Sequence, residues 1–241
     1  MDPYKQLAKL IQGTQKKHKK TLLDYHKLIY DTEVWKLNKW MGYTVWKTPM
    51  DLWMLQEIIF EIKPQLIIET GTAHGGSALY MASLLELIYK DNLDIGGVIS
   101  IDIDKLKIST LPKHPRIQFI TANSVDPRLV NELEQNSKGF APVLVVLDSD
   151  HSTAHVYKEL VYYSDIVTRG SFLIVEDTNL GIIVRTDEAK KLGIKEKPEN
   201  IGPGAAVRKF LKETDKFKVH PLCERFFVSF NPGGFLCKVK D

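Results

Sequence analysis

The stretch QLIIETGTAHGGSALYMA, residues 65–82, decides the fold of this chain. It opens on a short apolar run that ends in the carboxylate of Glu69, and glycines follow at positions 71, 75 and 76. From Ser77 onward, apolar residues recur near the 3.6-residue period of a helix. The stretch therefore predicts a strand, a tight turn and a helix, with Ser77 as a cap signal.

The glycine turn is suited to a polar ligand. Glycine serves where the backbone takes a positive φ or lies close to a ligand, and a helix N-terminus presents free N–H groups. The dinucleotide fingerprint G-x-G-x-x-G is not met, because Ala73 stands at its middle glycine. The turn instead suits a ligand with an amino-acid end and a nucleoside end, and Glu69 can meet an ammonium there. An ordinary turn that binds nothing is the alternative.

Composition limits the class of protein. The chain has 241 residues, 44% of them apolar, which supports a substantial core. A net charge of +3 is too small to argue for nucleic acid. Two cysteines, Cys223 and Cys237, make no disulfide framework and favour a reducing compartment. With neither a signal peptide nor an apolar run of membrane-spanning length, we expect a cytoplasmic protein.

Residues 1–50 are expected to form an N-terminal helical extension, and residues 51–241 the main domain. Apolar positions in the extension indicate two amphipathic helices, separated by a basic run at residues 16–20. That run is read as a solvated face, with acidic lipid or nucleic acid as the alternative. Trp35, Trp40 and Trp46 suggest core or a subunit contact, with substrate stacking as the alternative. We expect a homo-oligomer.

From residue 65 the chain alternates between strand-like and helix-like segments, which predicts an α/β fold with a mostly parallel, doubly wound sheet. The expected strands are 65–69, 97–102, 116–121, 142–147 and 171–176. The expected helices are a segment from Thr48 that stops before Pro64, then 77–89, 104–110, 126–136 and 153–167. Residues 177–203 read as a long loop, and a helix follows at 205–213. The tail predicts antiparallel strands at 217–220, 225–230 and 234–239, with a hairpin turn at 231–234.

Polar side chains follow each strand of the predicted sheet. In open α/β sheets the ligand binds outside the carboxyl ends of the strands. The residues at these ends are Glu69, then Asp102 and Asp104, then Asn123 and Ser124, then Asp148, Ser149, Asp150 and His151, and finally Glu176 and Asp177. Each has a structural alternative, such as a helix cap at Asp150. So many carboxylates on one edge repel one another and require a cation, a protonation shift or hydrogen bonds.

This edge divides into two halves. Glu69, the glycines, Asp102 and Ser124 suit a nucleoside-bearing cofactor. The carboxylates after the last two strands favour a hard divalent ion, Mg²⁺ above Zn²⁺. His74, His151 and His155 can add a nitrogen ligand, and His151 is a candidate general base.

Four motifs together resemble the cephalosporin hydroxylase family, whose relatives include rhamnosyl and macrolide-sugar O-methyltransferases. They are Glu69-Thr-Gly71-x-x-x-Gly75-Gly76-Ser77, Asp148-Ser-Asp150-His151-Ser, Val175-Glu176-Asp177-Thr and Gly202-Pro203-Gly204. The similarity runs from about residue 40 to the end. It implies a Rossmann-like class I methyltransferase fold that binds S-adenosylmethionine, often with Mg²⁺.

The resemblance also implies roles for individual residues. The turn, with Gly71, Thr72, Gly75 and Ser77, would hold the methionine end of the cofactor, while Asp102 would bind the ribose and Ser124 would lie near the adenine. Glu69 and Asp148 are placed among the cofactor contacts. Asp150, Glu176 and Asp177 would hold the metal, and Asp150 and His151 are the catalytic candidates. Asp148 rivals Asp150 as first ligand, because it precedes Glu176 by 28 residues, the spacing in related catechol-type enzymes, against 26 for Asp150.

The predicted function is therefore an S-adenosylmethionine-dependent, Mg²⁺-assisted O-methyltransferase that acts on a hydroxyl of a sugar, glycolipid or natural product. Residues 178–201 and the Trp-rich entry are the expected sites of acceptor choice. Two alternatives remain: an NAD-dependent oxidoreductase, and a non-catalytic cofactor-binding scaffold.

Overall fold

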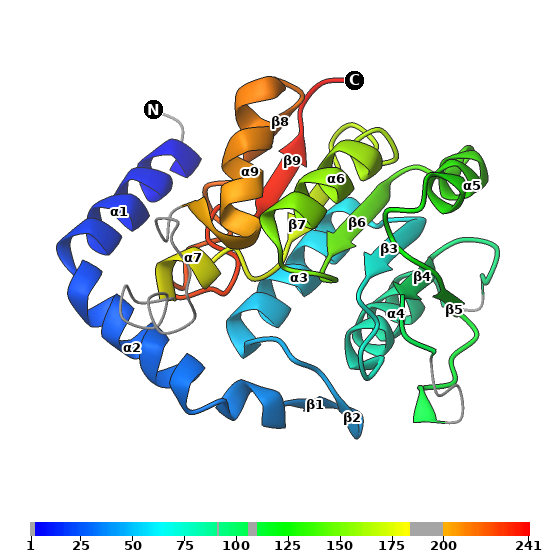
Figure 1. Ribbon diagram of the computed structural model, residues 1–241, viewed down its shortest axis with the longest axis horizontal. Helices are drawn as coiled ribbons and strands as arrows, with labels where there is room; N and C mark the ends of the chain where they lie inside the picture. The colour runs from blue at the N-terminus through cyan, green and yellow to red at the C-terminus, as the bar shows by residue number, and fades with distance from the viewer. Residues whose placement is uncertain (1–2, 91, 106–109, 184–199) are drawn as a thin grey trace.

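A computed structural model describes residues 3–90, 92–105, 110–183 and 200–241 (Figure 1). Its centre is a seven-stranded sheet with the order β5-β4-β3-β6-β7-β9-β8. The strands are β3 Leu66–Thr70, β4 Gly97–Asp102, β5 Ile117–Thr121, β6 Val143–Leu147, β7 Phe172–Val175, β8 Phe217–Val219 and β9 Phe235–Lys238. The first five are parallel, whereas β9 pairs antiparallel with both β7 and β8. The predicted α/β fold with a C-terminal antiparallel pair is confirmed.

Helices cover both faces of the sheet, because its central strands are apolar on both sides. Every residue of β3, β6 and β7 is buried. Ile68 belongs to the core under α5 Pro127–Ser137, α6 Thr153–Tyr163 and α9 Gly202–Glu213. Its neighbour Ile67 belongs to the opposite core, under α3 Pro49–Ile62 and α4 Gly76–Tyr89. This alternation of faces is the doubly wound arrangement.

The helix starts follow local capping signals. Thr48 accepts the amide N–H of Asp51 at the start of α3, and Pro49 occupies the first helical turn. Ser152 caps α6 in the same way, by accepting the amide N–H of His155. These caps hold the segments that precede them, and both segments carry residues of the site.

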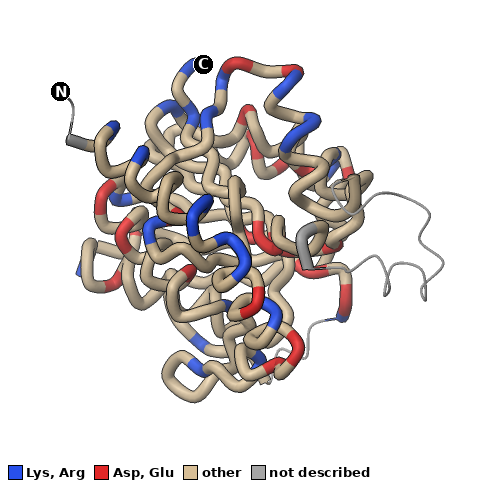
Figure 2. The backbone as a smooth tube through the Cα atoms, turned by 90° about the vertical axis from the view of Figure 1, so that its left-hand side faces the viewer, with Lys and Arg blue, Asp and Glu red and all other residues tan. Residues whose placement is uncertain are grey.

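The N-terminal part forms helices α1 Pro3–Lys17 and α2 Lys19–Asp31, as predicted, followed by the 3-10 helix η1 Val34–Leu37 and a hairpin of β1 Lys39–Trp40 with β2 Tyr43–Thr44. Helix α2 contacts the main domain through His26, which stacks on Phe230 at a ring distance of 5.4 Å. The basic run at 16–20 is exposed, as the solvated-face interpretation expects, and basic residues mark these helices blue in Figure 2. Within the described parts of the chain, no helix has both the length and the apolar character to cross a membrane.

The tail differs from the prediction. Residues 225–230 form turns and irregular backbone and no strand, although their aromatic and β-branched composition is strand-like. The reason lies in α3: the buried carboxylate of Asp51 accepts the Ser229 hydroxyl at 2.5 Å and the Phe230 amide N–H at 2.9 Å, so this segment is bonded to a helix rather than to a strand. The β8–β9 pair is therefore joined by residues 220–234 and not by a four-residue turn.

Two other predictions fall partly outside the described residues. The expected helix at 104–110 includes residues 106–109, and the expected loop at 177–203 includes residues 184–199, none of which is described. The described part of that loop contains the short helix α7 Leu180–Ile183, and α9 begins three residues earlier than predicted, at Gly202. Helix α6 ends at Tyr163, four residues before its predicted end.

Candidate functional site

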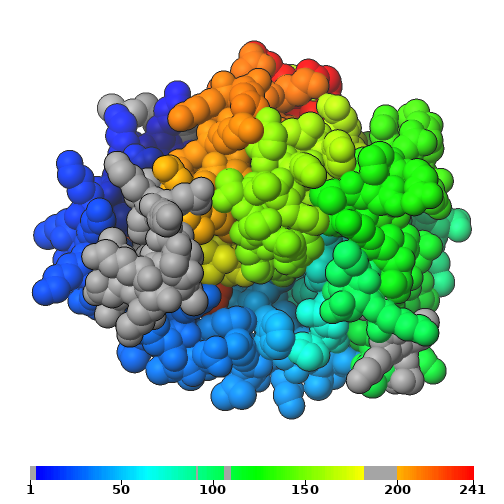
Figure 3. Space-filling view, in the orientation of Figure 1, coloured from blue at the N-terminus to red at the C-terminus, as the bar shows by residue number. Residues whose placement is uncertain are grey.

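A cavity of about 760 Å³ lies at the carboxyl ends of the parallel strands. The N-terminal segment forms its other wall; Figure 3 shows this segment in blue below the yellow-green region of α6. Of the residues proposed from the sequence, those that line the cavity are Gly71, Thr72, His74, Gly76, Ser77, Asp102, Asp104, Asn123, Ser124, Asp148, Ser149, Asp150, His151, His155 and Asp177. The predicted convergence of the strand ends on one edge is therefore present in the structure.

The glycines of the turn are required by close chain packing. A Cβ on Gly71, which has φ +86°, would lie 1.8 Å from the carbonyl oxygen of Asp148. A Cβ on Gly76 would lie 2.0 Å from the carbonyl oxygen of Thr44. Gly75, with φ 72°, is the residue before α4. The turn thus brings three chain segments together at one point, and this packing alone accounts for two of its glycines.

Glu69 lies behind the turn and does not line the cavity. Its side chain is fully buried and accepts the Ser100 hydroxyl at 2.7 Å, and that hydroxyl is also 2.7 Å from Thr72 Oγ1. Burial raises the pKa of Glu69 to about 7, against the opposing effect of Lys47 and the hydroxyls of Ser77 and Ser100. A carboxyl in this position stabilises the base of the turn.

Asp102 and Ser124 line the cavity from the ends of β4 and β5. The carboxylate of Asp102 accepts the amide N–H of Ala73 and that of Asp104, each at 3.0 Å. Ser124 Oγ lies 3.0 Å from His155 Nε2, the nitrogen that also lies 3.2 Å from Ser149 Oγ. Each polar group on this side is thus held by a neighbouring chain segment.

Two carboxylates on the other side of the cavity share one lysine. Lys47 Nζ lies 2.8 Å from Asp148 Oδ2 and 3.0 Å from Glu176 Oε1. Burial alone would lower the pKa of Lys47, but the carboxylates of Asp148, Glu176 and Glu69 outweigh it and raise the pKa. Burial raises the pKa of Glu176 to about 8, although Lys47 opposes this effect.

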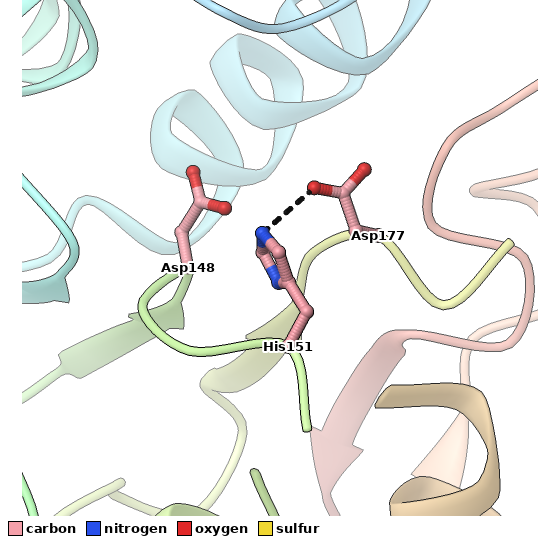
Figure 4. A group of neighbouring side chains, drawn as sticks. All are labelled: Asp148, His151 and Asp177. Carbon is pink, nitrogen blue, oxygen red and sulfur yellow. Dashed lines mark ion pairs between the residues drawn. The ribbon is translucent and has the colours of Figure 1, made fainter. Parts of the chain in front are cut away.

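Asp148, His151 and Asp177 converge on the cavity side of this ion pair. One oxygen or nitrogen from each lies within 4.8 Å of the others (Figure 4). His151 Nε2 lies 3.2 Å from Asp177 Oδ2. Burial raises the pKa of Asp177 to about 6, although the nearby His151 favours the ionised form. Two carboxylates and an imidazole form a donor set that fits a divalent cation.

The other two predicted metal ligands have different surroundings. Glu176 is buried and bound to Lys47, whereas Asp150 is exposed and accepts the amide N–H of Ser152 at 2.6 Å. That hydrogen bond lowers the pKa of Asp150. Asp150 therefore serves in the local turn before α6, whereas the helix cap, its structural alternative, is Ser152.

Two residues of the site, Lys47 and Asn231, were not identified from the sequence. The crowded carboxylates indicated that a counter-charge was needed, but no local signal marked Lys47, which lies on no strand. Asn231 belonged to the predicted hairpin turn, yet its side-chain oxygen accepts the amide N–H of Asp177 at 3.0 Å. Asp177 has φ +54°, an uncommon value for a residue with a side chain, so this contact holds a strained ligand position.

The three tryptophans of the N-terminal segment have separate roles. Trp35 and Trp46 line the cavity with Tyr30 and contact each other edge to face at 6.3 Å. Trp40 packs edge to face on Tyr80 of α4 at 4.8 Å. The core interpretation therefore holds for Trp40, whereas the other two stand at the mouth of the site.

The fold and the strand-end site define the class of Rossmann-like methyltransferases. The family model for rhamnosyl O-methyltransferase/CmcI matches residues 32–239, and the chain belongs to that family. This match confirms the family predicted from the sequence. It also confirms the predicted class of enzyme, an O-methyltransferase.

Individual relatives agree with this assignment. The rhamnosyl O-methyltransferase of Mycobacterium leprae (strain TN) is 34% identical over 161 residues, which cover 65% of this chain and 67% of that protein. The rhamnosyl O-methyltransferase of Mycobacterium bovis (strain BCG / Pasteur 1173P2) is 32% identical over 159 residues, covering 65% of this chain and 63% of that protein, slightly less than two thirds. A solved structure of CmcI with Mg and SAM shares the fold, with a TM-score of 0.61 and 18% identity over 85% of this chain and 78% of that chain.

Proposed function

We propose that this chain transfers the methyl group of S-adenosylmethionine to a hydroxyl of a small molecule, assisted by Mg²⁺. One observation carries the proposal: the glycine turn and Asp102 open into the same cavity as Asp148, His151 and Asp177. Methyl transfer needs a cofactor site next to a group that prepares the acceptor oxygen. The name of the relatives, rhamnosyl O-methyltransferase, supports a sugar acceptor, alone or as part of a glycolipid or natural product.

The β3–β4 side of the cavity is the proposed cofactor site. The turn at 71–77 would receive the methionine end, because Gly71, Thr72, Gly76 and Ser77 line the cavity there. Asp102 would accept the ribose hydroxyls, and Ser124 would lie near the adenine. Two features argue against the alternative of an NAD-dependent oxidoreductase. Ala73 replaces the middle glycine of the dinucleotide fingerprint, and the carboxylates after β6 and β7 have no role in hydride transfer.

The β6–β7 side is the proposed metal site. Asp148 and Asp177 would hold the cation, with Glu176 and Asp150 beside them and with the imidazole of His151 left to accept a proton. A bound Mg²⁺ would lower the pKa of the acceptor hydroxyl and shield its developing charge.

His151 is the proposed general base. Its ring lies in the cavity, and Asp177 is placed to stabilise the imidazolium that forms when the ring takes the hydroxyl proton. The acceptor oxygen then bonds to the methyl carbon as the carbon–sulfur bond breaks, and S-adenosylhomocysteine leaves. We expect His151→Ala to abolish the increase of the methyl-transfer rate with pH. An unchanged rate and pH profile in this variant would exclude His151 as the general base.

Calorimetric titration separates the three candidate functions. We expect S-adenosylhomocysteine to bind and NAD not to bind. Binding of NAD alone would favour the oxidoreductase, and binding of neither would favour the scaffold. Methyl transfer to a panel of free sugars and glycolipids, with Mg²⁺ and with excess chelator, then tests the acceptor and the metal. Full activity in chelator would discard the metal role.

The predicted homo-oligomer remains a prediction, which light scattering of the purified chain would test. The predicted acceptor loop at 178–201 lies mostly outside the described residues. We therefore propose Tyr30, Trp35 and Trp46 as the described part of the acceptor entrance, because they line the cavity opposite the strand ends.

A further inference from the structure

The buried ammonium of Lys47 provides a positive charge inside the site. Only 3% of the Lys47 side chain is exposed, and its ammonium contacts Asp148 and Glu176. These carboxylates follow two adjacent parallel strands, β6 and β7. A buried lysine is costly unless it is paired, so a lysine shared by two strand ends points to a specific role.

The backbone around Lys47 is anchored on both sides. Asn38 Nδ2 donates to the carbonyl oxygen of Lys47 at 2.9 Å, and Thr48, the next residue, caps α3. The carbonyl oxygen of Thr44 lies against Gly76 so closely that a Cβ there would be 2.0 Å away. The hairpin, the glycine turn and α3 thus fix the point from which the lysine reaches the carboxylates.

Lys47 and the candidate ion site share the carboxylate of Asp148. Lys47 Nζ donates to Oδ2, and a carboxylate oxygen of Asp148 also belongs to the group formed with His151 and Asp177. In Figure 4 the carboxylate of Asp148 faces the other two side chains. A carboxylate held at one oxygen has its second oxygen directed, which is how an outer partner orients a metal ligand.

We propose that Lys47 is a positioning residue for the cation site: its ammonium holds Asp148 and Glu176 together and directs Asp148 toward His151 and Asp177. This inference rests on the metal role in the proposed function. It also predicts a single ion per chain, because the ammonium already occupies the space between Asp148 and Glu176.

Manganese binding provides the test, with Mn²⁺ as the probe in electron paramagnetic resonance and calorimetry, without acceptor. Lys47→Met is expected to weaken Mn²⁺ binding at least ~10-fold, the usual effect of losing an outer partner of a metal ligand. Lys47→Arg keeps the charge and is expected to recover part of the affinity. The matched control is Lys36→Met: this lysine also lines the cavity but pairs with Glu33 at 2.6 Å, and its loss should change Mn²⁺ affinity by less than ~2-fold.

Binding of S-adenosylhomocysteine and circular dichroism verify that each variant is folded. If Lys47→Met does not fold, Lys47→Gln, which keeps a hydrogen-bond donor without the charge, takes its place with the same expected loss. Wild-type Mn²⁺ affinity in the Lys47 variants would overturn the inference and leave the proposed function standing. Tighter Mn²⁺ binding would also overturn it, because the lysine would then compete with the ion. A wild-type protein that binds S-adenosylhomocysteine but no Mn²⁺ would overturn both the metal role and this inference.

Discussion

On the β3–β4 side of the cavity, the carboxylate of Asp102 is satisfied by two backbone N–H groups of neighbouring turns. On the β6–β7 side, Asp148 and Glu176 are satisfied by one lysine that is distant in sequence, and Asp177 pairs with His151. The first side is completed by local chain geometry. The second side concentrates more negative charge than the lysine neutralises.

This difference indicates what each side is prepared for. A carboxylate already held by backbone groups can accept neutral hydroxyls without a further counter-ion, as a ribose requires. Glu176, which is buried, and Asp177, which is half-buried, have raised pKa values and favour either a proton or a cation. The two halves should therefore respond separately to mutation, and each prediction below tests this separation.

Replacing the charge of Asp148 should produce the largest effect. Asp148→Asn removes the carboxylate that joins Lys47 to the candidate ion site, and we expect turnover to fall roughly 10³-fold, about 4 kcal/mol. The affinity for S-adenosylhomocysteine should change by less than ~2-fold if the halves are independent. Steady-state rates and calorimetry on the same preparation measure both quantities.

Asp150→Asn is the companion variant, since both aspartates were candidates for the first ligand. Its carboxylate is exposed and engaged by Ser152, so a loss of about 10-fold or less is expected. A larger loss at Asp150 than at Asp148 would assign the ion to Asp150. A loss of cofactor binding in Asp148→Asn would break the separation of the two halves.

Gly71 of the glycine turn packs against the backbone of Asp148, so a substitution there tests the contact between the β3–β4 side and the β6–β7 side of the cavity. Gly71→Ala places a Cβ against the backbone carbonyl oxygen of Asp148 and forces a side chain into φ +86°. Neither the backbone nor the dihedral adapts cheaply, so we expect a loss of ~3 kcal/mol in the free energy of unfolding. Urea unfolding measures it. Gly13→Ala in α1, where a Cβ meets nothing within 4 Å, is the control and should stabilise the helix by up to ~1 kcal/mol.

Glu69 lies behind both halves, and its effect depends on pH. Burial raises its pKa from 4.5 to about 7, so the folded protein keeps a proton that the unfolded chain releases between these values. The stability from this site is fully present below about pH 4.5 and is lost as the pH rises through about 7. Glu69→Gln does not titrate, and its stability relative to wild type should rise by roughly 2 kcal/mol from pH 5 to pH 8. A difference independent of pH would contradict this account.

The parallel core and most of the site were accessible from the sequence, because parallel strands deliver their carboxyl ends to one edge. Asp102 ends β4, Asp148 and His151 lie in the loop after β6, and Asp177 lies in the loop after β7, so finding the strands placed them together. Lys47 follows no such rule. A hairpin, a cap and a glycine contact bring it to the carboxylates, and these depend on packing between distant segments.

In the tail, a distant contact instead prevents a strand that the sequence predicted. Residues 225–230 have the aromatic and β-branched composition of a strand, yet the carboxylate of Asp51 accepts the Ser229 hydroxyl and the Phe230 amide N–H. Asp51 looks like an ordinary first-turn acid in the sequence. Its burial and its partners 178 and 179 residues away are tertiary facts that no local pattern contains.

A smaller effect than at Asp148 is expected on the cofactor side, at Asp102. Asp102→Asn keeps one oxygen but turns the other into an N–H₂ group, so one of the amides of Ala73 and Asp104 would face a donor instead of an acceptor. We expect the Kd for S-adenosylhomocysteine to rise ~10-fold, about 1.4 kcal/mol, because the turn loosens and a ribose acceptor is lost. The Mn²⁺ affinity should stay within ~2-fold of wild type, because the ion site lies on β6 and β7. Equal losses of cofactor and ion binding in Asp102→Asn would mean that the two halves form one coupled unit. A loss confined to cofactor binding, together with unchanged cofactor affinity and lost turnover in Asp148→Asn, would establish that the cavity holds two independent sites.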